Sequence, residues 1–168
     1  HVSRFTHHAP LGLAVDLGST SLAGYLVDLE TGETLASQGA MNPQISFGED
    51  IISRVVYAHK HPDGAQHLRR AVLDALNHLA GSLCQEAGAG RDDIFDAVIV
   101  GNRAMHHLLL GLPTRQLTAA PFVPTADQSL DFGAAEVGLE LAAGAAPHIL
   151  PNIAGLVGAE HVAMLLAT

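Results

Sequence analysis

Two apolar segments separated by only four residues constrain the fold of this chain most strongly. The segment LGLAVDLGSTSLAGYLVDL contains strand patterns at Leu11–Leu17 and Leu22–Leu29, joined by Gly-Ser-Thr-Ser. Parallel strands need a crossover of about a dozen residues, so a link this short predicts an antiparallel hairpin. The turn LETGE, with Gly32 at a position that tolerates positive φ, then leads into a strand at Thr34–Gln38. The start of the chain therefore predicts a three-stranded antiparallel meander.

Helices and strands alternate in the remainder of the sequence. A loop at 41–50 leads into a helix predicted at Glu49–Ala58, and a longer helix begins near Pro62. The apolar residues of the longer helix recur at spacings of three and four, namely Leu68, Val72, Leu76, Leu79 and Leu83. The further predicted elements are a buried strand at Phe95–Asn102, a short helix from Arg103 to a Gly111 C-cap, a strand at Pro147–Gly155 and a helix at 158–168. Residues 113–147 show no clear pattern that predicts a helix or a strand. This order predicts an α/β fold with a mixed sheet and helices on its faces.

Composition narrows the classes of partner and compartment. The chain has 168 residues, is 48% hydrophobic and 15% charged, and carries a formal net charge of −9. These values are typical of one globular domain, and the acidic balance argues against nucleic acid or an anionic membrane as a partner. The single cysteine, Cys84, can form no internal disulfide and cannot ligate an iron–sulfur cluster alone. No apolar run is long enough to span a bilayer, and the start of the chain carries no signal-peptide pattern. We expect a cytoplasmic protein.

The two ends of the chain suggest its organisation. Residues 1–10 are predicted to be a leader or linker, and residues 11–168 a single lobe. The sequence stops inside the apolar helical pattern at 158–168, without a C-cap glycine or a polar tail. We therefore expect this chain to be a fragment of a longer protein.

The hairpin link is the strongest candidate site. Gly18, Ser19, Thr20 and Ser21 place several backbone N–H groups and three hydroxyls in a small space, which is suited to binding an anion. Asp16 would repel a phosphate directly, but it fits if Mg²⁺ lies between them with water interposed. The pattern therefore predicts nucleotide phosphates with magnesium. The alternative is an ordinary turn in which Asp16 caps its own loop.

Longer segments carry a family resemblance. The strand, the D-L-G-S-T tip, the second strand and the TGE turn resemble the first phosphate motif of the actin-like ATPase superfamily, whose fold pairs two ribonuclease-H-like lobes around ATP. Five segments in order resemble the reductive activators of corrinoid proteins, and they run from Leu11 to Thr168: AVDLGSTSLAGYLVDLETGETLA, NPQISFGEDIISRV, VGNRAMHHLLLGL, APFVP and LPNIAGLVGAEHVAMLLAT.

The resemblance implies a function for the intact protein. It implies one ribonuclease-H-like lobe of an ATP-dependent electron donor that returns cob(II)alamin to cob(I)alamin. A ferredoxin-like [2Fe–2S] domain and a second phosphate motif belong to that family but are absent from this chain. The implied partners are a corrinoid protein and the second ATPase lobe, and a homodimer is allowed. We expect the isolated chain to bind ATP weakly and to hydrolyse none. The alternatives are an interaction module with a vestigial phosphate motif and a lobe of a sugar or acid kinase.

Other glycines and one asparagine are weaker candidates for the same cleft. Gly101 and Asn102 end a buried strand, where ligands gather in open α/β sheets. The alternative for Asn102 is an N-cap of the following helix. Gly155 lies between a predicted strand and helix, where backbone N–H groups can bind phosphate. For Gly158 we favour close packing.

The remaining polar residues have ordinary explanations. Adjacent His106 and His107 diverge by about 100° on a helix, so they cannot easily chelate one ion. His59 and His61 lack a clear third ligand, and we expect no native zinc site among the eleven histidines. Cys84 is expected in the core. Glu49 and Asp50 suit the first turn of the first predicted helix, where the helix dipole favours acidic side chains. Arg54 is expected to pair with Asp50 at i,i+4.

Overall fold

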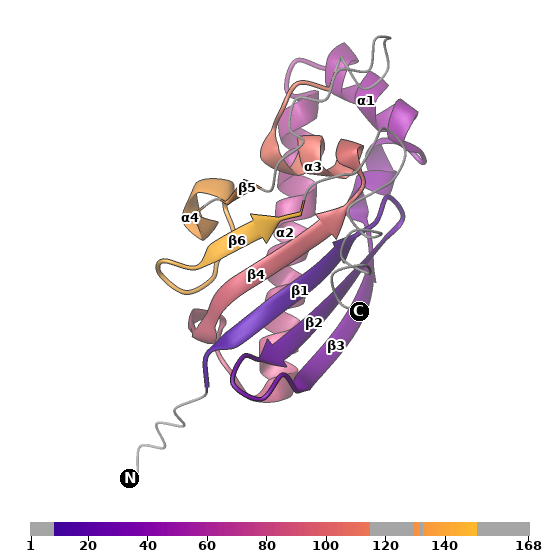
Figure 1. The fold of residues 1–168 in the computed structure, drawn as a ribbon. Helices are drawn as coiled ribbons and strands as arrows, with labels where there is room; N and C mark the ends of the chain where they lie inside the picture. Colours follow the sequence, from indigo (N-terminus) through magenta and orange to yellow (C-terminus); the bar gives the residue numbers. More distant parts are fainter. Residues whose placement is uncertain (1–8, 115–129, 132, 151–168) are drawn as a thin grey trace, which may run out of the picture.

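A six-stranded mixed sheet backed by one long helix forms the body of the molecule. The computed structural model describes residues 9–114, 130–131 and 133–150. The strands lie in the order β3-β2-β1-β4-β6-β5, and Figure 1 shows them with helix α2 crossing behind. In chain order the elements are β1 Leu11–Leu17, β2 Ser21–Asp28, β3 Thr34–Met41, the 3₁₀ helix η1 Pro43–Phe47, α1 Ile51–Lys60, α2 Gly64–Ala87, η2 Arg91–Asp93, β4 Ile94–Gly101, α3 Arg103–Leu110, β5 Leu130–Asp131, α4 Ala134–Val137 and β6 Ala146–Ile149.

The predicted meander is confirmed. Strands β1 and β2 pair antiparallel with Leu17 opposite Leu22, and β2 pairs antiparallel with β3. Gly32 has φ 75° in the turn between β2 and β3. Strand β4 then lies parallel to β1 on its other side, and β6 lies parallel to β4. The carboxyl ends of β1, β4 and β6 therefore meet at one edge of the sheet.

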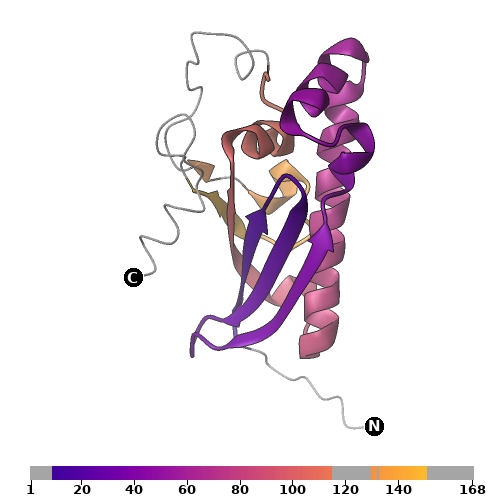
Figure 2. The same cartoon turned by 90° about the vertical axis from the view of Figure 1, so that its right-hand side faces the viewer.

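Alternation along the strands explains why one face of the sheet is buried. Leu11, Leu13, Val15 and Leu17 are 0–5% exposed, whereas Asp16 between the last two is exposed. Helix α2 covers this apolar face, as Figure 2 shows. The packing is close at β2, because a Cβ on Gly24 would lie 2.8 Å from Leu79 Cδ2. The five apolar residues predicted for the α2 stripe are all buried at 2% exposure or less.

Several element boundaries differ from those predicted. Strand β3 runs to Met41 rather than Gln38, because pairing with β2 continues to Ser21 opposite Met41. The predicted loop at 41–50 contains η1, capped by Asn42. Helix α1 begins at Ile51, so Glu49 lies before the N-cap Asp50 and not in the first turn. The capping role of Asp50 is confirmed, since its Oδ1 accepts from Ser53 N at 2.7 Å.

Residues 113–147, which carried little signal, contain β5, α4 and the first residues of β6. The last predicted strand begins one residue early, at Ala146, and pairs with β4 as far as Ile149. Residues 151–168, with Gly155, Gly158 and the last predicted helix, lie outside the described residues, as does the leader at 1–8.

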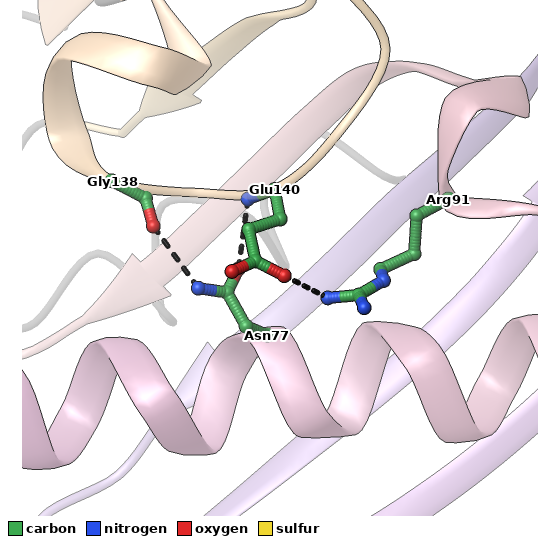
Figure 3. A network of polar contacts seen from close by, with 4 residues as sticks. All are labelled: Asn77, Arg91, Gly138 and Glu140. Carbon is green, nitrogen blue, oxygen red and sulfur yellow. Dashed lines mark hydrogen bonds and ion pairs between the residues drawn. The ribbon is translucent and has the colours of Figure 1, made fainter.

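Side chains from α2 and η2 hold the segment around α4. Asn77 Nδ2 donates to Gly138 O at 3.0 Å, and Asn77 Oδ1 accepts from Glu140 N at 2.9 Å. Arg91 pairs with the Glu140 carboxylate, and Figure 3 shows the four residues together. Arg69 adds bonds to Val137 O and to Leu109 O. These contacts, distant in sequence, fix the segment that leads into β6.

Candidate functional site

The tip between β1 and β2 lies where the strands end. Asp16 is exposed, and its strand neighbours are Ala23 on β2 and Val100 on β4. Thr20 and Ser21 are also exposed, while Gly18 and Ser19 are half-buried. The structure thus brings the predicted carboxylate and the small residues of the tip together at an accessible edge.

The tip is tight enough to require glycine at position 18. A Cβ there would lie 2.6 Å from Ser21 O, a backbone atom that cannot move aside. Outside the strand ladders, the N–H groups of Ser19 and Thr20 donate to no backbone carbonyl among the described residues. An exposed carboxylate, three hydroxyls and the backbone N–H groups of the tip are a donor set that fits Mg²⁺ with phosphate oxygens.

Gly101 and Asn102 reach the same edge by register. Gly101 lies opposite Leu17 in the parallel pair of β1 and β4, so Asn102 follows beside Gly18. Gly101 is needed for close packing, because a Cβ there would lie 2.8 Å from Leu17 O. Asn102 caps helix α3, where its Oδ1 accepts from Met105 N at 3.1 Å. The capping alternative for Asn102 is therefore confirmed, and a ligand role for either residue stays a prediction.

Asn42 is a residue of the site that sequence reasoning missed. It is fully buried, its Nδ2 donates to Gly18 O at 2.8 Å, and its N–H donates to Thr20 O at 2.9 Å. Its Oδ1 accepts from Gln44 N at 3.0 Å, which caps η1. Asn before Pro43 signals a cap or a turn. Nothing in the sequence indicates that the other end of its amide reaches the tip, 24 residues earlier.

Arg54 corrects another prediction. The expected surface pair with Asp50 does not form, because Arg54 is fully buried and its Nε donates to Gly48 O at 2.8 Å. Its Nη1 lies 3.8 Å from Met105 Sδ, and its Nη2 has no hydrogen-bond partner in the described part of the chain. Burial lowers the pKa of this guanidinium, while the nearby charge of Asp50 acts in the opposite direction. Since Asp50 instead uses its carboxylate on Ser53, the arginine is free to turn inward.

The histidine pair on α3 is buried. His106 and His107 are 6% and 4% exposed. Burial, with a smaller contribution from the neighbouring His107, lowers the pKa of His106 to about 4. His107 Nδ1 donates to Pro113 O at 2.8 Å. Across residues 9–114, 130–131 and 133–150, no group of three or more His, Cys, Asp or Glu side chains is placed to hold a metal ion.

Two other features lie away from the tip. A groove of about 730 Å³ runs beside α2, lined by charged side chains of both signs that include Asp63, Arg70 and Glu140, and it shares no residue with the tip. Cys84 is confirmed in the core at 2% exposure, where burial and the charge of Asp93 raise the pKa of its thiol. None of the helices among the described residues is both long and apolar enough to cross a bilayer.

Comparison with known proteins decides the family. Residues 11–168 match the family described as the RACo middle region. The chain belongs to that family. It is 33% identical over 155 residues to the "Corrinoid activation enzyme RamQ" of Eubacterium limosum, a match that covers 92% of this chain and 26% of RamQ.

A solved structure confirms the predicted fold. The "Reductive activator for corrinoid, iron-sulfur protein" superposes with a TM-score of 0.91 at 38% identity, over 95% of this chain and 26% of that one. The predicted ribonuclease-H-like lobe of an actin-like ATPase is the observed fold class. The chain spans only about a quarter of the length of both RACo-like relatives.

Proposed function

We propose that this chain is the first ATP-binding lobe of an ATP-dependent reductive activator of a corrinoid protein. The intact activator would return cob(II)alamin to cob(I)alamin for methyl transfer, in the cytoplasm. The electron would come from a [2Fe–2S] cluster in another part of the activator, because this chain supplies a single buried thiol. The relatives named above, both activators of corrinoid proteins, support this class of partner.

Asp16 would hold Mg²⁺ through water, and Gly18, Ser19, Thr20 and Ser21 would hold the phosphates. The single observation that carries this assignment is the exposed Asp16 carboxylate at the base of a tight tip of Gly and hydroxyl residues, where the N–H groups of Ser19 and Thr20 bond to no described backbone carbonyl outside the strand ladders. When bound, Mg²⁺ neutralises phosphate charge.

Gly101 and Asn102 would border the nucleotide from the next strand, and Gly155 is proposed for the same cleft. A second ATPase lobe would close over the phosphates. Closure or hydrolysis would move the two lobes relative to each other, and this movement would change the affinity for the corrinoid protein.

Asp16→Asn in the full-length activator tests the proposal. The substitution removes the charge and keeps the size, so we expect Mg·ATP affinity and ATP-dependent corrinoid reduction to fall at least tenfold while binding of the corrinoid protein is retained. Calorimetry measures the affinity, and the absorbance change of the corrinoid reports its reduction. Unchanged ATP turnover would instead favour an interaction module with a vestigial tip. A phosphorylated small-molecule product would indicate a kinase lobe.

A further inference from the structure

Asn42 lies outside the tip in sequence, but its side chain bonds to it. It contacts both ends of the tip: its side chain donates to Gly18 O at 2.8 Å and its main-chain N–H donates to Thr20 O at 2.9 Å. Ser19 therefore lies between two anchored carbonyl groups. Asn42 is fully buried, so water does not compete for these bonds.

The hydrogen bond from Asn42 to Gly18 O also fixes the direction of the Ser19 N–H. The peptide unit is planar and trans, so the carbonyl of Gly18 and the N–H of Ser19 point in opposite directions. A carbonyl held inward by Asn42 thus directs the Ser19 N–H away from η1. Outside the strand ladders, that N–H donates to no backbone carbonyl among the described residues.

Two further contacts hold the side chain of Asn42. Its Oδ1 accepts from Gln44 N, and its Nδ2 lies 3.6 Å from the sulfur of Met105. The buried Arg54 approaches the same sulfur with Nη1 at 3.8 Å. The N–H of Met105 is in turn bonded by Asn102. A buried polar cluster therefore joins the end of β3, the start of α3 and the tip.

We infer that Asn42 is a positioning residue for the nucleotide, which orients the Ser19 N–H toward a phosphate oxygen. This inference rests on the proposed function and adds a residue that the tip motif does not contain. Asn42 does not touch the ligand in this scheme. It acts through the Gly18–Ser19 peptide.

Asn42→Ser in the full-length activator is the test. Serine keeps an acceptor for Gln44 N at the cap of η1 but cannot reach Gly18 O, and it adds no charge. We expect the Kd and KM for Mg·ATP to rise about five- to tenfold, the worth of one well-placed hydrogen bond, with a smaller change in kcat.

Asn77→Ser is the matched control. Asn77 also donates to a glycine carbonyl and accepts from a main-chain N–H, but it joins α2 to Gly138, away from the tip. We expect its Kd and KM for Mg·ATP to stay within about twofold of wild type. Thermal unfolding of both variants separates loss of stability from loss of nucleotide affinity.

Each remaining outcome decides the inference. An unchanged Kd in a folded Asn42→Ser protein, together with weakened binding in Asp16→Asn, would overturn the positioning role and leave the proposed function intact. Unchanged binding in both variants would overturn the proposed function as well. If Asn42→Ser does not fold, the isosteric Asn42→Asp is measured in its place. Failure of both to fold would refute the inference, because Asn42 would then be a requirement of the fold.

Discussion

Leu17 and Gly101 are register partners in the parallel strands β1 and β4, and the carbonyl of Leu17 lies where a side chain on residue 101 would begin. This contact brings the tip after Leu17 beside the turn at Asn102. Two segments more than 80 residues apart thus meet at one edge of the sheet, because the parallel ladder pairs the ends of β1 and β4.

Gly101→Ala is expected to destabilise the lobe. The new Cβ would lie 2.8 Å from Leu17 O, so one strand must shift. Overpacking of this kind costs about 1–3 kcal/mol in the free energy of unfolding, which urea denaturation measures. Gly39→Ala on the edge strand β3 is the control, because its Cβ would meet nothing closer than 3.7 Å. Equal effects of the two substitutions would contradict the packing argument.

Asp50→Ala is expected to weaken the start of α1. The Asp50 carboxylate accepts from Ser53 N and Ser53 Oγ, and these bonds hold its pKa below the ordinary value. Loss of an N-cap of this kind lowers the melting temperature of a chain this size by about 2–4 °C. Asp63→Ala serves as the control, because Asp63 occupies the N-cap of α2 without a side-chain hydrogen bond. A larger fall with Asp63→Ala in differential scanning calorimetry would show that capping is not the cause.

Acid is expected to destabilise the lobe through His106. Its pKa in the folded state is about 4, below the ordinary 6.5, because burial disfavours the charged ring. The unfolded chain therefore binds more protons between these values. The contribution of the neutral His106 ring to the free energy of unfolding is complete above pH 6.5. It falls as the pH drops toward 4, by about 3 kcal/mol in total.

His106→Gln checks this pH dependence, since glutamine keeps a donor and an acceptor but does not titrate. The free energy of unfolding, measured in urea between pH 7 and pH 4.5, should fall less steeply in the variant than in the wild type. Parallel curves for the two proteins would assign the acid sensitivity to other groups.

The 168-residue chain alone is expected to bind Mg·ATP weakly or not at all. It spans 26% of each relative, and the proposed clamp needs a second lobe to close over the phosphates. Isothermal titration of the isolated chain should show no heat at nucleotide concentrations that saturate the full-length activator. Micromolar affinity in the isolated chain would contradict this expectation.

Local patterns made much of this lobe predictable. The four-residue link required a hairpin, the leucine spacing located α2, and Asn102 and Gly111 marked the two ends of α3. The segment from 113 to 147 was not predictable, because α4 is a single turn held by Asn77 and Arg69 from α2. Elements stabilised by distant side chains leave no periodic trace in their own residues.

The sequence by itself determined the antiparallel start and the apolar face of β1, because both depend on neighbours within a few residues. Only the tertiary structure decided that Asn42 holds Gly18 and that Arg54 turns inward rather than toward Asp50. Both choices depend on which carbonyl groups are left without a partner once η1 packs against α2 and α1. A buried N–H donor such as those of Asn42 and Arg54 needs a hydrogen-bond acceptor, and the tertiary structure decides which carbonyl group is within reach.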